Sequence, residues 1–136
     1  MSTNVSQDMV QAAVEIRKRA YAPYSRFLVG AAIRCEDGRI FTGCNVENAA
    51  YPEGICAEGG AISAMVAAGG RKITEVIVCC DSAIPCTPCG GCRQKLREFA
   101  TPNLTIRMVS KDGQELFAQT LEELLPHSFG PESLNV

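Results

Sequence analysis

The chain has 136 residues, 46% of them hydrophobic and 21% charged, with a formal net charge of −2. This composition is ordinary for a globular protein, and the length predicts a single domain over residues 1–136. Lys and Arg form no run, so long nucleic acid is a poor partner, and no apolar run approaches the ~20 residues that span a membrane. Because residues 1–11 are polar and lack the apolar stretch of a signal peptide, we expect a cytoplasmic protein.

Hydrophobic periodicity predicts nine elements in the order αββαβαββα. They are helix 6–20, strands 27–33 and 39–46, helix 55–68, strand 75–80, helix 92–99, strands 104–109 and 114–118, and helix 120–125. Strand 75–80 lacks apolar alternation, which is typical of a central strand buried on both faces. The predicted fold is α/β, a three-layer α/β/α sandwich with a mixed sheet of about five strands.

One predicted helix contains the adjacent pair Gly59-Gly60 in its first turns. Each Gly is unfavourable in a helix by about 1 kcal/mol relative to Ala. The pair therefore indicates that another part of the chain approaches the helix backbone closely.

The chain has eight cysteines and a single histidine, His127. The cysteines are Cys35, Cys44, Cys56, Cys79, Cys80, Cys86, Cys89 and Cys92. In a cytosolic protein, clustered cysteines indicate a metal site or catalysis more often than disulfides. We interpret Cys35, Cys44, Cys79 and Cys80 as core residues. His127 lies in a turn-like stretch and is interpreted as a surface residue. Because it is the single histidine of the chain, a metal site with two or more histidine ligands is excluded.

Cys56, Cys89 and Cys92 are each predicted to lie on the first turn of a helix, where the partial positive charge lowers a thiol pKa. In one interpretation these three thiolates hold zinc, a water takes the fourth position, and Glu58 acts as the nearby acid/base. In another, Cys86 completes a closed Cys₄ site and the protein is a zinc-stabilised binding module without catalysis. A redox C-x-x-C protein is a third interpretation. Only the first gives Glu58 a task.

Two further residues, Asn45 and Glu47, are candidates for a substrate contact. Asn45 and Glu47 flank Val46, so their side chains project from one face of the chain. An amide beside a carboxylate suits the vicinal hydroxyls of a ribose, although from these residues alone a solvated strand end is the preferred explanation of the pair. Phe27, judged by itself, fits a core position.

The residues Cys56-Ala57-Glu58 and Pro88-Cys89-Gly90-Gly91-Cys92 match the zinc deaminase signature. Four longer stretches, 22–32, 43–55, 92–94 and 123–126, extend the likeness. Together they resemble the small, homotetrameric, zinc-dependent cytidine deaminases over nearly the whole chain.

This resemblance implies an enzyme that deaminates cytidine and deoxycytidine hydrolytically to uridine and deoxyuridine plus ammonia, in pyrimidine salvage. It implies one Zn²⁺ per subunit on Cys56, Cys89 and Cys92. Zinc lowers the pKa of its water, and Glu58 would pass protons from that water to the ring N3 and to the leaving amino group. A deaminase of another cyclic amine or of a modified nucleoside is the alternative enzyme.

The resemblance also implies substrate contacts for six residues. Asn45 and Glu47 match contacts to the ribose 3′-hydroxyl, Phe27 matches an aromatic packed on the base, and the Ala57 backbone matches a contact to the base. Tyr51 and Phe129 match aromatics near the active site. Phe129 would reach in from a neighbouring subunit, so the implied assembly is a homotetramer with shared active sites.

One position departs from the family pattern. Gly59 stands where the family usually has an Arg that hydrogen-bonds the ligand thiolates. Three thiolates on Zn²⁺ leave a net charge of −1, which weakens the metal as a Lewis acid. Helix dipoles with Gln94 or Arg93 would compensate this charge, or the enzyme would be slower or adapted to another substrate.

Overall fold

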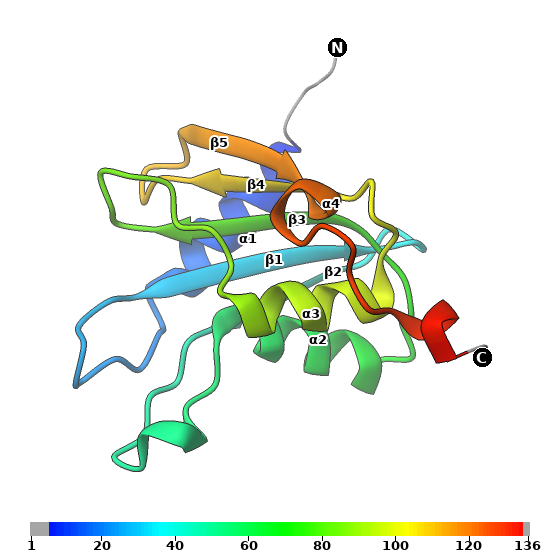
Figure 1. Cartoon of the computed structure of the whole chain (residues 1–136). Coiled ribbons are helices and arrows are strands. Elements are labelled where there is room, and N and C mark those ends of the chain that lie inside the picture. Colours follow the sequence, from blue (N-terminus) through cyan, green and yellow to red (C-terminus); the bar gives the residue numbers. More distant parts are fainter. Residues whose placement is uncertain (1–5, 135–136) are drawn as a thin grey trace.

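The computed structural model describes residues 6–134, which form one mixed five-stranded sheet with helices on both faces (Figure 1). The strands are β1 (Val29–Cys35), β2 (Ile40–Cys44), β3 (Ile73–Cys80), β4 (Thr105–Val109) and β5 (Glu115–Thr120). The helices are α1 (Gln7–Arg17), α2 (Ala57–Ala67), α3 (Gly90–Phe99) and α4 (Leu121–Leu124), with 3-10 turns at Tyr51–Glu53 and Pro131–Leu134. The strand order is β2-β1-β3-β4-β5, and of the neighbouring pairs β3–β4 is parallel and the others antiparallel.

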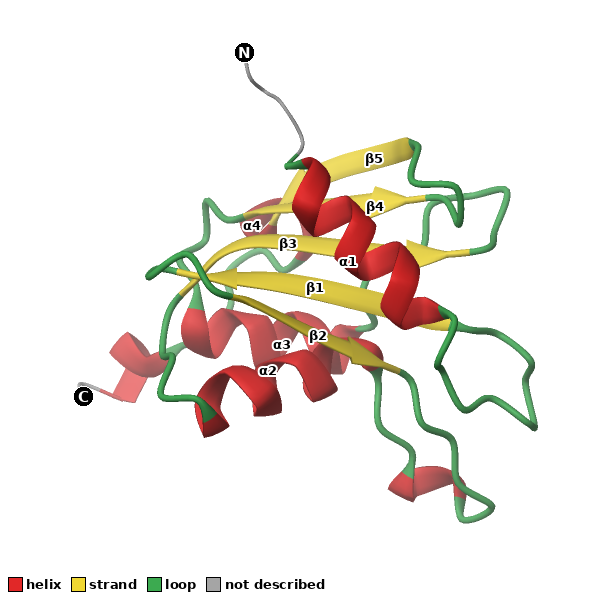
Figure 2. Ribbon diagram, turned by 180° about the vertical axis from the view of Figure 1, so that it is seen from behind, coloured by secondary structure: helices red, strands yellow, loops and turns green. Residues whose placement is uncertain are grey.

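The sheet is the middle layer of the three that the sequence predicted. Helix α1 covers one face, and α2 and α3 cover the other (Figures 1 and 2). Alternate residues of β3 face the two layers: Ile77 and Cys79 pack with α1, whereas Val76 and Val78 pack in the cluster that includes α2 and α3. Burial on both faces explains why this strand reads as a continuous apolar run.

Most helix and strand boundaries lie within two or three residues of the predicted ones. The predicted helix 55–68 begins later, at Ala57, because Ile55 is still extended and bridges Val46. The helix predicted over residues 6–20 ends earlier, at Arg17. Asp37-Gly38 and Asp112-Gly113 are hairpin signals in the sequence, and both hairpins are present, with Gly38 at φ 93° and Gly113 at φ 86°, in the left-handed region that such turns require.

Helix α2 lies unusually close to β2. A Cβ atom on Gly43 would lie 2.3 Å from the carbonyl oxygen of Ala57 and 2.4 Å from the amide nitrogen of Ala61. A Cβ on Gly60 would lie 3.6 Å from the Cα of Gly43, so two glycines face one another across this contact. The close approach expected from the Gly59-Gly60 pair is confirmed for Gly60. At Gly59 the surroundings are open, with no contact nearer than 3.9 Å.

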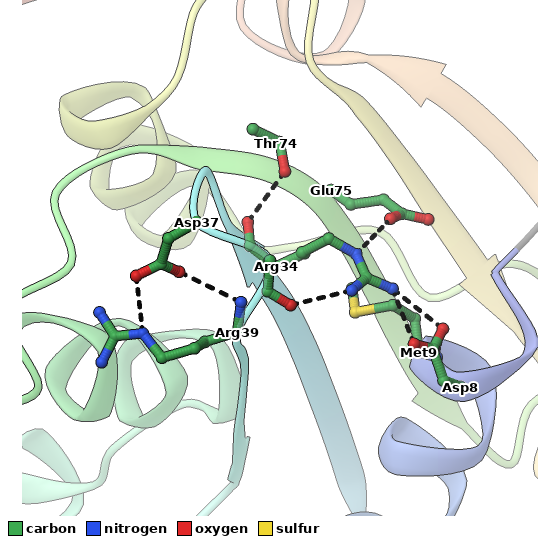
Figure 3. Close-up of polar contacts among 8 residues, drawn as sticks. Asp8, Met9, Arg34, Asp37, Arg39, Thr74 and Glu75 are labelled. Carbon is green, nitrogen blue, oxygen red and sulfur yellow. Dashed lines mark hydrogen bonds and ion pairs between the residues drawn. The ribbon is translucent and has the colours of Figure 1, made fainter.

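An ion-pair network centred on Arg34 connects the C-terminal end of β1 to its neighbours (Figure 3). Arg34 pairs with Asp8 of α1 at 2.9 Å and with Glu75 of β3 at 3.0 Å, and it donates to the carbonyl oxygen of Gly38 at 3.0 Å. The Arg34 guanidinium lowers the pKa of the Asp8 carboxyl. This network joins a helix to two strands and leaves the other end of β1, at Val29, for the candidate site.

Within residues 6–134, none of the helices is long and apolar enough to cross a membrane.

Candidate active site

Three cysteines from two helix N-termini meet at one side of the sheet. Cys56 is the N-cap residue of α2, Cys89 is the N-cap residue of α3, and Cys92 lies in the first turn of α3. Their sulfur atoms all lie within 4.8 Å of one another, and in this group Cys92 is the buried member. Both helices begin beside the end of β3 (Figure 1), so the fold brings together ligands that are 36 positions apart in the chain.

The three thiols do not share the lowered pKa expected for cysteines at helix N-termini. Only the pKa of Cys89 is lowered, chiefly because the backbone N–H of Cys92 donates to its sulfur. Burial raises the pKa of Cys56 and strongly raises that of Cys92. Neighbouring thiolates and the Glu58 carboxylate add to the increase at Cys92. The expectation was therefore wrong for two of the three, since desolvation and mutual repulsion exceed the helix dipole. Burial and mutual repulsion thus oppose simultaneous ionisation of all three thiols, and a bound cation would favour it.

Glu58 lies in the first turn of α2 with only 4% of its surface exposed. Burial raises the pKa of its carboxyl, although interactions with the Cys92 thiol and with Lys95 oppose the increase. A buried carboxyl with a raised pKa, placed beside possible metal ligands, is suited to act as a general acid and base.

A cavity of about 310 Å³ opens in front of the cysteines and Glu58. The predicted site residues that line it are Phe27, Asn45, Glu47, Cys56, Ala57, Glu58 and Cys89. Ser25, Val29, Val78, Cys86 and Thr87 line it as well and were not assigned to the site from the sequence. The volume is at the lower end of the range typical of small-molecule sites.

Asn45 and Glu47 face the same cavity, as their alternation predicted, but both are also bonded to the loop that carries Phe27. The Asn45 side chain accepts from the backbone N–H of Val29 and donates to the carbonyl oxygen of Phe27, each at 2.8 Å. Glu47 accepts from the N–H groups of Tyr24 at 2.9 Å and Ser25 at 3.1 Å, and from the Ser25 hydroxyl. The Ser25 hydroxyl, followed by these backbone N–H groups, lowers the pKa of the Glu47 carboxyl. These two side chains therefore shape the cavity wall as well as facing into it.

Cys86 forms a disulfide with Cys80 at the end of β3. Cys80 is buried, as predicted for a core residue, and the disulfide is a further role that the sequence did not indicate. The pairing depends on the loop after β3 folding back onto the strand, which no local pattern in the sequence reveals. Since its sulfur is bonded to Cys80, Cys86 does not complete a closed Cys₄ site in this structure.

Comparisons with known proteins agree with this geometry. Residues 3–108 match the model of the cytidine and deoxycytidylate deaminase zinc-binding region. The chain belongs to the cytidine and deoxycytidylate deaminase family.

Individual relatives match along most of their length. The cytidine deaminase of Sporosarcina psychrophila is 37% identical over 129 residues, covering 95% of this chain and 94% of that protein. The crystal structure of cytidine deaminase from Burkholderia pseudomallei superposes with a TM-score of 0.85 at 38% identity, covering 93% of this chain and all of that one. The Mycobacterium leprae enzyme gives a TM-score of 0.76 at 43% identity over 91% of this chain and all of that one.

Two aromatic residues that the deaminase resemblance singled out lie outside the cavity. Tyr51 is 77% exposed and lines a neighbouring cavity of about 400 Å³, which shares Ser25 and Glu47 with the first. Its ring packs edge-on against Tyr24 at 6.1 Å. Phe129 is 57% exposed and lines neither cavity, so within one chain it does not complete the site.

The structure also restricts what replaces the usual deaminase Arg at Gly59. The Arg93 guanidinium donates hydrogen bonds to the carbonyl oxygens of Pro88 and Leu124, each at 2.7 Å, and to the Thr87 hydroxyl. Gln94 donates to the carbonyl oxygen of Phe129 at 2.8 Å. None of these hydrogen bonds is made to the three sulfurs. Lys95 lies near the open side of Gly59, where its Cδ would be 3.9 Å from an added Cβ.

Proposed function

We propose that this deaminase converts cytidine and deoxycytidine to uridine and deoxyuridine by hydrolysis, with release of ammonia. The observation that carries the proposal is the buried Glu58 carboxyl, with its raised pKa, beside three clustered thiols at the wall of a cavity. The likeness to cytidine deaminases over more than nine-tenths of the chain supports the same substrate class.

The donor set fits a zinc ion. Cys56, Cys89 and Cys92 offer three sulfurs within 4.8 Å of one another, and catalytic zinc takes three protein ligands with one position left for water. The raised pKa values of Cys56 and Cys92 indicate a site whose thiols ionise when a cation binds. When bound, zinc supplies a water of lowered pKa as the nucleophile.

Glu58 acts as the proton carrier in this proposal. It accepts a proton from the attacking water and delivers one to N3 of the cytosine ring, which makes C4 more electrophilic. After the water oxygen has added to C4, Glu58 takes up the remaining proton of that hydroxyl group and delivers it to the amino group, so that the C4–N bond breaks and ammonia leaves. Burial suits this role because the desolvated carboxyl holds a proton more readily than an exposed one.

Four other residues that line the cavity bind the nucleoside. Phe27 packs against the base, and the backbone of Ala57 contacts it. Asn45 and Glu47 bind the ribose 3′-hydroxyl with the polar atoms that their loop contacts leave free. All four residues line the one cavity that Glu58 faces, which supports this assignment.

We further propose that the protein is a homotetramer in which Phe129 of one subunit completes the cavity of another. Large apolar side chains are exposed on the loops around the cavity, namely Tyr21, Tyr24, Phe27, Val46, Tyr51 and Ile55. Such a grouping on two adjacent loops is typical of a surface that a partner covers. Tyr51 would lie at this contact, beside the second cavity.

The activity is tested by measuring ammonia release from a panel of pyrimidine nucleosides, with Glu58→Gln as the control. We expect release from cytidine and deoxycytidine and almost none with the control variant. Release only from a modified nucleoside would replace the substrate assignment. No release from any pyrimidine would favour an unrelated amine substrate or a non-enzymatic zinc module.

The shared site is tested by co-expressing a Glu58→Gln chain with a Phe129→Ala chain. If Phe129 crosses between subunits, some hybrid sites contain an intact Glu58 and a partner's Phe129, and the KM of those sites returns to the wild-type value. If Phe129 acts within its own chain, no hybrid site contains both residues and the KM stays that of Phe129→Ala.

A further inference from the structure

One of the two buried charged side chains among the described residues is Glu58, and the other is Arg97. Arg97 lies on α3, and 9% of its side chain is exposed. A buried guanidinium is unfavourable unless its donors are satisfied. Because Arg97 is buried on the same helix as Cys92, solvation at the surface does not explain why a charged residue occupies this position.

The donors of Arg97 are directed at the segment that follows α4. The Nε–H donates to the Ser128 hydroxyl at 2.8 Å, and a terminal nitrogen donates to the Glu132 carboxylate. Gln94, one turn earlier on the same helix, donates to the carbonyl oxygen of Phe129 at 2.8 Å. Figure 1 shows this part of the chain running from α4 past α3.

Gly130 allows the segment to lie against the guanidinium. A Cβ atom added at Gly130 would lie 2.6 Å from the Cζ of Arg97, closer than any real side chain approaches. Gly130 is buried, and its own N–H donates to the Ser133 hydroxyl at 3.2 Å. Residues 128–132, which we name the C-terminal arm, are thus fixed at Ser128, Phe129, Gly130 and Glu132.

Phe129 behaves differently from its neighbours in the arm. Its backbone is held by Gln94, yet 57% of its surface is exposed. The ion pair between Arg97 and Glu132 adds little stability by itself, because Glu132 is 66% exposed and solvent screens the pair. Together these contacts tie the backbone of the arm to α3 while the ring of Phe129 stays exposed.

We propose that Arg97 is a positioning residue for the deaminase reaction. It fixes the C-terminal arm from inside one subunit, so that Phe129 meets the nucleoside cavity of a second copy of the chain. The inference rests on the proposed function and on the shared site, and it assigns the task of ordering the arm to Arg97, with Gln94 and Gly130 in support. Ordering the arm before association removes the entropy loss that a flexible arm would incur on binding.

The test uses the zinc-loaded, full-length enzyme and the variant Arg97→Met, which keeps an unbranched side chain without the donors. We expect KM for cytidine to rise about five- to tenfold, the effect of losing an aromatic contact of about 1 kcal/mol, with kcat and zinc content nearly unchanged. Arg107→Met is the matched control. Arg107 pairs with Glu115 on β5 and is also mostly buried, at 20% exposure, but it lies outside the arm, so KM should stay at the wild-type value.

A double-mutant cycle separates positioning from a general structural role. If Arg97 acts through Phe129, Arg97→Met adds nothing to the KM of Phe129→Ala. Gly130→Ala provides a second test with the Arg97 side chain intact, because the added methyl would lie where the Arg97 guanidinium and the Glu132 carboxylate now meet, so it weakens the hold of Arg97 on the arm, and we expect KM to rise in the same direction. Additive effects of Arg97→Met and Phe129→Ala, or a lowered melting temperature with wild-type KM, would overturn the proposal.

The fate of the arm can be followed without any reaction. Amide hydrogen exchange over residues 128–134 should quicken in Arg97→Met and stay unchanged in Arg107→Met, and equal exchange in both variants would also contradict the proposal. If the wild-type enzyme released no ammonia while exchange behaved as expected, the proposed activity would fail and the ordering of the arm by Arg97 would stand.

Discussion

The side-chain amide of Asn45 donates to the carbonyl oxygen of Phe27 at 2.8 Å, so the residue proposed to bind the sugar also holds the residue proposed to pack on the base. The same side chain accepts from the N–H of Val29, the first residue of β1. The two proposed substrate contacts are therefore mechanically connected, and a change at one should be felt at the other.

Asn45→Ala should raise KM for cytidine about 10- to 100-fold. It removes the proposed sugar contact and the side-chain partner of two backbone groups that are exposed or part-buried, which should also lower the free energy of unfolding by about 1 kcal/mol. Asn45→Asp should be no better, because its second oxygen faces the Phe27 carbonyl where an N–H is required. Steady-state kinetics and denaturant unfolding measure both effects. Asn103→Ala, in a turn away from the cavity, is the control, and an unchanged KM in Asn45→Ala would refute the link.

Glu47 gives a pH dependence with a defined direction. The Ser25 hydroxyl is the first cause of its lowered pKa, followed by backbone N–H groups. Because the folded-state pKa is depressed, the contacts of the carboxylate are fully present above the ordinary glutamate pKa of about 4.3 and are lost as the pH falls through the folded value. Ser25→Ala should raise that folded pKa toward the ordinary one, so that nucleoside affinity begins to fall at a higher pH.

Binding of a non-reacting cytidine analogue, followed by calorimetry across the acidic range, measures this shift. Ser82→Ala, on the loop after β3, serves as the control because its hydroxyl contacts Ile84 and not Glu47. Identical pH profiles for the wild type and Ser25→Ala would show that Ser25 does not set the ionisation of Glu47.

The sequence was sufficient for the fold and for the centre of the site because both depend on local patterns. Helical and strand periods gave the element order, and Asp-Gly pairs marked the two hairpins. The cysteines and Glu58 could be placed because their spacing relative to two helix starts is part of the signature. The side-by-side position of Asn45 and Glu47 followed from strand alternation alone.

What the sequence could not reveal depends on contacts between distant segments or on burial. Arg97 and Glu132 are 35 positions apart, and their contact requires the chain after α4 to return to α3. The Cys80–Cys86 bond depends on how the loop after β3 folds. The thiol pKa values were misjudged because the helix dipole can be inferred from position, whereas the desolvation of Cys92 appears only when its neighbours are in place.

The disulfide and the metal ligands should separate cleanly in two cysteine variants. Cys56→Ser should lose the metal. Cys86→Ser should keep about one metal per chain, because Cys86 lies outside the cluster of three sulfurs. The bond closes a short loop, so its loss should lower the free energy of unfolding by about 2 kcal/mol. Metal analysis and thermal unfolding, with and without a dithiol reductant, measure these effects.

Cys86→Ser should be insensitive to the reductant, and the reduced wild type should unfold at the temperature of that variant. Loss of metal in Cys86→Ser with retention in Cys56→Ser would contradict the ligand assignment. A wild type that unfolds identically under both conditions would show that the disulfide does not form in solution.

Gly59 offers a test of how the charge of the site is adjusted. A side chain fits at this position, since an added Cβ would meet only Ile55 and Lys95 at 3.9 Å. Gly59→Ala should raise the free energy of unfolding by up to about 1 kcal/mol through helix propensity. Gly59→Arg adds a cation close to three thiolates, so it should favour their ionised form and move the acidic limb of the kcat/KM profile to lower pH. Gly59→Ala is the matched control and should leave that limb in place, because it changes the helix without changing the charge. If the profiles of the two variants coincide, position 59 does not control the charge of this site.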